Sequence, residues 1–162
     1  MPIVKEMSGH QYSIDTFKGT VWSEKDGTPR PSNGHTFGPW NNNLREIFES
    51  NLKDYKEYMT VLEGLSSETI PLLPDNMDII YIDASHYYKD VLSDITLCLP
   101  KLQKGGIICG DDCESSFRAG GYSESELNSD SVRNIHCGVV QAVHDVFGDD
   151  VILDYPIWMK IV

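Results

Sequence analysis

Three aspartates directly follow two of the most apolar segments of the chain. Asp83 comes after MDIIYI (77–82), and Asp111 and Asp112 come after GIICG (106–110). Short apolar runs of this kind are typical of strands that are buried on both faces of a parallel sheet. Ligands of open parallel sheets bind beyond the carboxyl ends of the strands. The pattern therefore predicts that all three carboxylates lie along one edge of a sheet.

Carboxylates that meet repel one another unless a positive charge lies between them. Hard divalent cations prefer oxygen ligands, so we hypothesise that Asp83, Asp111 and Asp112 bind a divalent cation such as Mg²⁺. The competing interpretation is structural. Asp83 would cap a turn or a helix, and the other two aspartates would form an ordinary polar turn.

His86 and Asp15 are further candidates. His86 lies three residues after Asp83 and could act as a general base near neutral pH, or it could be a solvated or helix-capping histidine. Asp15 ends an earlier strand-like run, where an acid often accepts hydrogen bonds from ribose hydroxyls but can equally be a turn residue.

Strand and helix patterns alternate along most of the chain, which predicts an α/β fold with a mostly parallel sheet and helices on both faces. The predicted strands are 12–17, 58–62, 77–82, 107–109, 151–153 and 157–162, the last two forming an antiparallel pair. Apolar residues at helical spacing predict helices over 44–55, 66–73, 91–102 and 132–147, the last ended by Gly148. No domain linker interrupts the pattern, so we expect a single domain over 1–162.

Composition narrows the possible partners. The net charge is −12 at pH 7, which argues against a nucleic acid and against an anionic membrane surface. No apolar run reaches the roughly 20 residues of a membrane span. The four cysteines include no CxxC pair and indicate reduced thiols in a cytoplasmic protein.

Two features remain ambiguous. Residues 20–43 are rich in Gly, Pro, Asn and aromatic residues without a period, which fits either a substrate-covering loop or a surface excursion. A zinc site made of Cys109, Cys113, His136 and Cys137 is conceivable, but this spacing matches no common zinc pattern.

The segments YSIDTFKG, FESNL, VLEGLSSETIPLL, DIIYIDASHYYKDVLSDI and LPKLQKGGIICGDD together resemble class I S-adenosylmethionine-dependent methyltransferases. The similarity is greatest to the branch around macrocin O-methyltransferase and extends from Tyr12 to Val162. It implies a Rossmann-like fold, with S-adenosylmethionine and a divalent cation as cofactors.

The resemblance also implies residue roles. Asp15 would bind the cofactor ribose, and Leu65 and Ser66 would flank the adenine. Asp83 would contact both the cofactor and the metal. Asp111 and Asp112 would be the other two metal ligands. The family's usual base position is Ser85 here, so His86, together with Asp83, is the candidate for catalysis.

The family begins with a strand, a Gly-rich turn and a helix, and no such turn precedes Tyr12. PIVKEMSGH resembles the last turn of that helix, ended by Gly9. The resemblance thus predicts an N-terminally incomplete domain that lacks the first strand and helix. Exposed strand edges invite pairing, so a homo-oligomer is an open alternative.

The expected function is metal-assisted O-methylation of a small molecule, possibly at a sugar hydroxyl. One alternative is a degenerate methyltransferase fold that binds or assembles without catalysis. Another is a different metal-dependent α/β enzyme, such as a hydroxylase or a phosphohydrolase. For phosphoryl transfer Arg118 is the only basic residue near the acids.

Overall fold

The computed structural model describes residues 2–18, 44–114 and 121–162. The chain divides into two compact units, Met1–Thr69 and Ile70–Val162, which are considered separately below. The predicted loop 20–43 and Arg118 fall outside the described residues. Whether the chain behaves as a single domain stays a prediction.

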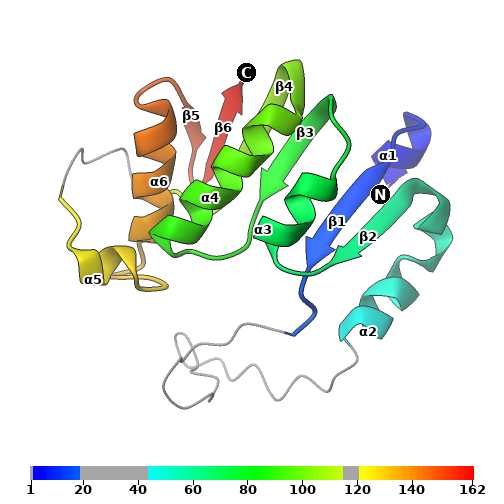
Figure 1. Ribbon diagram of the computed structural model, residues 1–162, viewed down its shortest axis with the longest axis horizontal. Coiled ribbons are helices and arrows are strands. Elements are labelled where there is room, and N and C mark those ends of the chain that lie inside the picture. The colour runs from blue at the N-terminus through cyan, green and yellow to red at the C-terminus, as the bar shows by residue number, and fades with distance from the viewer. Residues whose placement is uncertain (1, 19–43, 115–120) are drawn as a thin grey trace. The chain divides into compact units, whose positions relative to one another are not determined.

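The first unit is built around two parallel strands (Figure 1). Its elements are α1 (Pro2–Glu6), β1 (Gln11–Asp15), α2 (Leu44–Asn51), the 3₁₀ helix η2 (Lys53–Tyr58), β2 (Met59–Glu63) and α3 (Ser66–Thr69). The two strands pair in register from Gln11 opposite Met59 to Asp15 opposite Glu63. Both carboxyl ends therefore lie at the same edge.

The second unit contains a four-stranded sheet in the order β3-β4-β6-β5. Its elements are η3 (Ile70–Leu72), β3 (Met77–Ile82), α4 (Tyr88–Cys98), η4 (Leu99–Lys101), β4 (Leu102–Gly110), α5 (Glu124–Leu127), α6 (Cys137–Phe147), β5 (Ile152–Asp154) and β6 (Ile157–Ile161). The pair β3–β4 is parallel, whereas β6 is antiparallel to both β4 and β5. The α/β class, the parallel sheet and the antiparallel C-terminal strands are confirmed.

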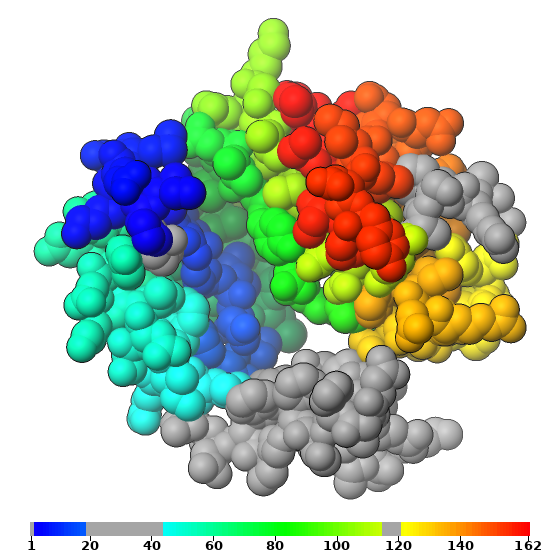
Figure 2. All heavy atoms as spheres, turned by 180° about the vertical axis from the view of Figure 1, so that it is seen from behind, coloured from blue at the N-terminus to red at the C-terminus, as the bar shows by residue number. Residues whose placement is uncertain are grey.

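Helices α4 and α6 pack together on one face of this sheet (Figure 1). Their apolar stripes supply much of the core, with Ile95, Val140 and Val143 at most 1% exposed against Ile108 of β4 and Trp158 of β6. Seen from behind, strand β6 (red) reaches the surface (Figure 2). On β3, Ile79 and Tyr81 are 58% and 52% exposed.

That exposure corrects the prediction that β3 is buried on both faces. The four consecutive apolar or aromatic residues after Asp78 cannot distinguish a strand covered on both faces from one covered on a single face, because coverage depends on distant elements. The helix predicted over 132–147 begins later, at Cys137. Val132 and Ile135 instead form an isolated antiparallel bridge.

The thiols are reduced and largely enclosed. Burial raises the pKa of Cys98 and of Cys113 from 9.0 to about 12. We therefore expect these two thiols to remain protonated and unreactive toward a disulfide reagent at pH 8, and to react fully in urea. Because the folded state holds these protons more tightly, their contribution to stability falls as the pH rises from about 9 toward 12. Rapid labelling of either thiol in the native protein, located by mass spectrometry, would contradict this.

Candidate active site

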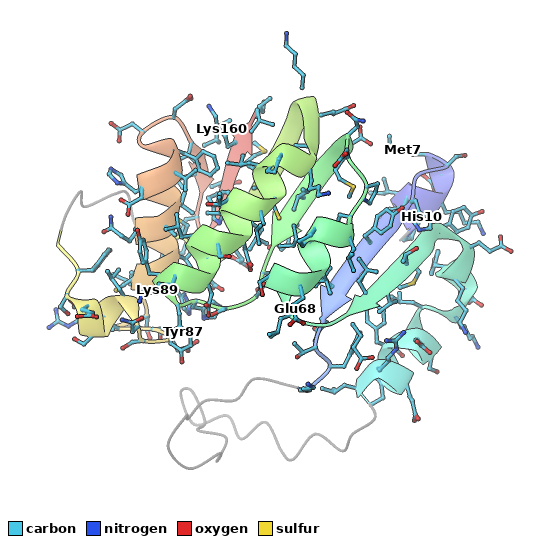
Figure 3. All side chains as sticks on the ribbon, in the orientation of Figure 1. Met7, His10, Glu68, Tyr87, Lys89 and Lys160 are labelled. Carbon is cyan, nitrogen blue, oxygen red and sulfur yellow. The ribbon has the colours of Figure 1, made fainter. Side chains whose placement is uncertain are left out.

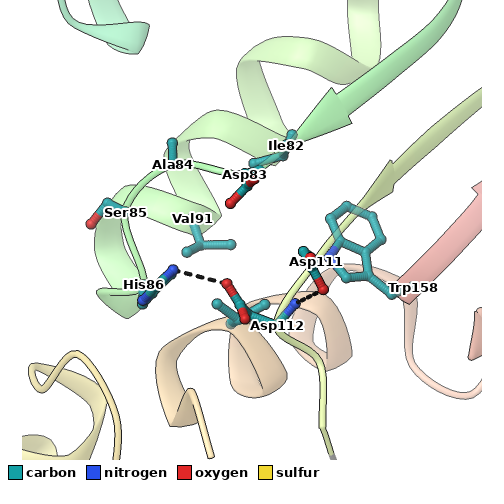
Figure 4. Close-up of a pocket in the computed structure, with 10 residues that line it drawn as sticks. Ile82, Asp83, Ala84, Ser85, His86, Val91, Asp111, Asp112 and Trp158 are labelled. Carbon is teal, nitrogen blue, oxygen red and sulfur yellow. Dashed lines mark hydrogen bonds and ion pairs between the residues drawn. The ribbon is translucent and has the colours of Figure 1, made fainter. Parts of the chain in front are cut away.

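The carboxyl ends of β3 and β4 meet, as the apolar runs predicted. Ile82 pairs with Gly110 in the parallel ladder, and the Asp111 amide donates to the Ile82 carbonyl at 3.3 Å. The side chains of Asp83, His86, Asp111 and Asp112 line one pocket together with Trp158 (Figure 4). All of the pocket's residues belong to the second unit.

The predicted metal ligands are not equivalent in this pocket. Asp83, His86 and Asp112 each offer one ligand atom, and these three atoms lie within 4.8 Å of one another. Asp111 joins no such group among the described residues; its Oδ1 accepts a hydrogen bond from the Asp112 amide at 2.8 Å. The donor set assembled here is thus two carboxylates and one imidazole. The complete aspartate triad stays a prediction.

Asp112 is the most constrained of the acids. It has a φ of 63°, a left-handed conformation that aspartate tolerates better than most residues. Burial raises the pKa of the Asp112 carboxyl, while His136 and His86 act in the opposite direction. A half-buried carboxylate facing two imidazoles is a good ligand for a positive charge.

His86 is held through both ring nitrogens. Nε2 lies 2.9 Å from Oδ2 of Asp112, and Nδ1 lies 2.8 Å from Oδ1 of Asp130. Its ring meets that of His136 edge to face, with the centroids 4.3 Å apart. This network excludes a purely solvated or helix-capping histidine.

Sequence reasoning did not join Asp130, His136 or Glu114 to this site. It named His136 only in a conceivable zinc site with three cysteines. His136 precedes α6, and its Nδ1 pairs with Glu114, whose other oxygen accepts the His136 amide at 2.9 Å. Asp130 is 44 residues from His86. Their spacing follows neither helix nor strand periodicity, so no sequence signal indicated the cluster. No cysteine joins a metal-ligand group in the described part of the chain.

Tyr87 and Tyr88, at the start of α4, differ in their surroundings. Tyr87 is exposed, with Lys89 beside it on the surface (Figure 3). The Tyr88 hydroxyl donates to Oδ2 of Asp145 on α6 at 2.8 Å, and this hydrogen bond raises the pKa of Tyr88. Tyr88 therefore ties α4 to α6, the two elements that follow His86 and His136.

The other predicted residues, Asp15, Leu65 and Ser66, gather in the first unit. The Gly64 amide donates to the Asp15 carbonyl at 3.1 Å, which places the turn carrying Leu65 and Ser66 beside the end of β1. Oδ1 of Asp15 accepts the Phe17 amide at 2.6 Å, and Leu65 is 56% exposed. The three share one edge of the strand pair, while their roles toward ribose and adenine stay predictions.

Comparison with known proteins identifies the class. A family model described as a methyltransferase domain matches residues 2–113, which is more than half of the chain. The chain therefore belongs to this methyltransferase-domain family, and the resemblance to class I S-adenosylmethionine-dependent methyltransferases is confirmed at that level. The macrocin branch stays a prediction. No curated protein matches the chain.

Solved structures show the same fold. The O-methyltransferase NovP is 18% identical, with a TM-score of 0.59, covering 94% of this chain and 59% of NovP. CalS11, a TDP-rhamnose 3′-O-methyltransferase of calicheamicin biosynthesis, is 17% identical, with a TM-score of 0.51, covering 94% and 58%. The SAH-bound methyltransferase PaMTH1 of Podospora anserina is 14% identical, with a TM-score of 0.53, covering 75% and 58%.

The chain thus spans about three fifths of the length of these structures, 58–59%. At these identities the likeness establishes the fold alone. Among the described helices, none is long and apolar enough to cross a bilayer.

Proposed function

We propose that this chain takes part in the transfer of a methyl group from S-adenosylmethionine to a hydroxyl of a small molecule. The observation that carries the proposal is the meeting of Asp83, His86 and Asp112 at the carboxyl ends of β3 and β4, within a chain of the methyltransferase-domain family. A sugar hydroxyl is the preferred acceptor, since CalS11 acts on TDP-rhamnose.

The chain's own residues supply the proton acceptor and the carboxylates. As the acceptor oxygen bonds to the methyl carbon and the carbon–sulfur bond breaks, the hydroxyl proton passes to His86. In the structure both nitrogens of His86 face carboxylates. One contact must open before the imidazole can accept a proton, and the Asp112 contact is the one that borders the pocket. When bound, S-adenosylmethionine supplies the electrophilic methyl group on its sulfonium.

A divalent cation fits part of the predicted site. Asp83 and Asp112 can present oxygens to one ion, whereas Oδ1 of Asp111 accepts the Asp112 amide. When held there, Mg²⁺ supplies a Lewis acid that lowers the pKa of an acceptor hydroxyl. The chain contributes mainly orientation of the acceptor beside His86 and exclusion of water.

Calorimetric titration with S-adenosylhomocysteine tests the proposal. We expect saturable binding, and methyl transfer from radiolabelled S-adenosylmethionine to at least one member of a panel of nucleotide sugars. If neither S-adenosylhomocysteine nor S-adenosylmethionine gave a binding heat, with or without Mg²⁺, the proposal would lose its support. Binding without transfer to any acceptor would favour the non-catalytic alternative.

Thermal unfolding tests the proposed binding of Mg²⁺. Mg²⁺ is expected to raise the Tm of the wild-type chain by mass action and to leave the Tm of Asp112→Asn unchanged. Asp149→Asn, which removes an exposed carboxylate outside the pocket, is the matched control and should respond as wild type. Equal shifts in all three proteins would place the ion elsewhere.

A further inference from the structure

Two histidines meet beside the pocket, which His86 lines, and acidic side chains surround both rings. His86 precedes α4 and His136 precedes α6, and their rings lie 4.3 Å apart. The surrounding acids are Asp112, Glu114 and Asp130. The side chains of both histidines are about four fifths buried, with 21% and 18% exposed. The cluster lies wholly within the second unit.

Each imidazole has a carboxylate behind one of its nitrogens. Asp112 contacts Nε2 of His86 at 2.9 Å, and Glu114 pairs with Nδ1 of His136. The nitrogens that could bind an ion are then Nδ1 of His86, which faces Asp130, and Nε2 of His136. Metal-binding histidines characteristically use one nitrogen for the ion and give the other to a carboxylate, which orients the ring.

A third donor completes the set. Oδ1 of Asp130 lies 2.8 Å from Nδ1 of His86. His86, His136 and Asp130 each offer one ligand atom, all within 4.8 Å of one another. Ligands about 2.1 Å from a common ion are separated by about 3.0–3.4 Å in octahedral or tetrahedral geometry. Small side-chain rotations would therefore bring these atoms around one ion.

We propose that His86, His136 and Asp130 bind a transition-metal ion, with Asp112 and Glu114 as positioning residues behind the two imidazoles. Two imidazoles and one carboxylate favour ions of the Mn²⁺ to Zn²⁺ series over Mg²⁺, which prefers oxygen ligands alone. This donor set differs from the Asp83–Asp112 pair discussed above. It shares with the proposed reaction only His86 and Asp112.

The competing arrangement is a metal-free network in which hydrogen bonds alone join the two histidines to the three surrounding carboxylates. The two arrangements differ in whether the cluster takes up a metal.

The inference does not rest on methyl transfer. A bound ion would occupy Nδ1 of His86 and direct the Nε2 proton toward Asp112, so the ring could not accept a proton from a substrate. Transition-metal loading is therefore expected to inhibit methylation while leaving S-adenosylhomocysteine binding intact. If the chain does not bind a transition metal, the proposed methyl transfer is unaffected. If the chain does not transfer methyl groups, the proposed metal site is likewise unaffected.

Absorption spectroscopy of the chelator-treated full chain with Co²⁺ tests the site. We expect visible ligand-field bands that saturate at one ion per chain. His136→Gln should weaken Co²⁺ binding by about 100-fold or more, and Glu114→Gln by about 10- to 100-fold, as for other residues behind a metal ligand. The control is His10→Gln, which removes a histidine that hydrogen-bonds only Thr60 among the described partners and should bind as wild type.

Three results would overturn the proposal: no saturable binding, wild-type affinity in His136→Gln, or intense near-ultraviolet charge transfer. The last would mean thiolate ligands, for which Cys113 and Cys137 lie nearby in sequence. Circular dichroism identifies any variant that has not folded. Where a variant has not folded, its Co²⁺ affinity cannot be compared with that of wild type. Electron paramagnetic resonance of Cu²⁺ bound to the wild-type chain is then the test, and the expected result is hyperfine coupling to two nitrogens. Coupling to fewer than two would reject the site.

Discussion

His86→Gln is expected to lower the kcat of methyl transfer by about 10²- to 10⁴-fold, the usual contribution of a positioned general base. The KM for S-adenosylmethionine should change little, because the residues predicted to hold ribose and adenine lie in the first unit. Glutamine keeps a polar side chain between Asp112 and Asp130 but cannot take up a proton. The measurement is steady-state transfer of a labelled methyl group.

His10→Gln is the matched control and should retain the wild-type rate. A His86→Gln rate within about threefold of wild type would show that another group accepts the proton, since a base contributes far more.

Gly138→Ala is expected to produce the largest loss of stability from a single methyl group. Gly138 lies in the first turn of α6, where a Cβ would come within 2.2 Å of the His86 carbonyl oxygen and 2.5 Å of the Tyr88 amide nitrogen. Both are backbone atoms, so no side-chain rotation relieves the contact. The helix must move away from the segment that carries His86.

Two opposing terms determine the size of this effect. Alanine is favoured over glycine within helices by about 1 kcal/mol, whereas overpacking costs about 1–3 kcal/mol and occasionally more. Because two backbone atoms are involved, we expect the clash to exceed the gain by about 2 kcal/mol. In a chain of this size, that lowers Tm by about 4–8 °C.

Thermal unfolding of Gly138→Ala and Gly121→Ala provides the comparison. A Cβ at Gly121 meets no atom of the described residues within 4 Å, so that variant should unfold close to the wild-type Tm. Gly138→Ala should also reduce Co²⁺ affinity, because α6 places His136 beside His86. An unchanged Tm for Gly138→Ala would mean that α6 and the His86 segment are less closely packed than the structure shows.

Local patterns were sufficient for the strands and for one edge of the sheet. The run MDIIYI coincides with β3, and YSID falls within β1. Asp83 and Asp111 follow residues that pair in the parallel ladder, Ile82 and Gly110. Their common position follows because neighbouring parallel strands end at the same edge. The motif resemblance, confirmed by the family match, also depended on sequence order alone.

Tertiary packing decided the orientation and surroundings of those acids. Asp111 turns toward the Asp112 amide, although its place in the sequence is equivalent to that of a ligand. The face of β3 that carries Ile79 and Tyr81 is exposed, because α4 and α6 pack on one face. The start of α6 was set by the bridge between Val132 and Ile135, which removed these two residues from the apolar stripe.

The sequence by itself determined the alternation of strand and helix, the methyltransferase class and the edge where Asp83, Asp111 and Asp112 gather. These properties follow from local periodicity and from chain order. Only the tertiary structure brought His136, Glu114 and Asp130 around His86. Glu114 follows β4, Asp130 and His136 lie in the loop between α5 and α6, and the contact between His86 and Asp130 spans 44 residues. Proximity of that kind is set by the packing of α4 against α6, which no local pattern encodes.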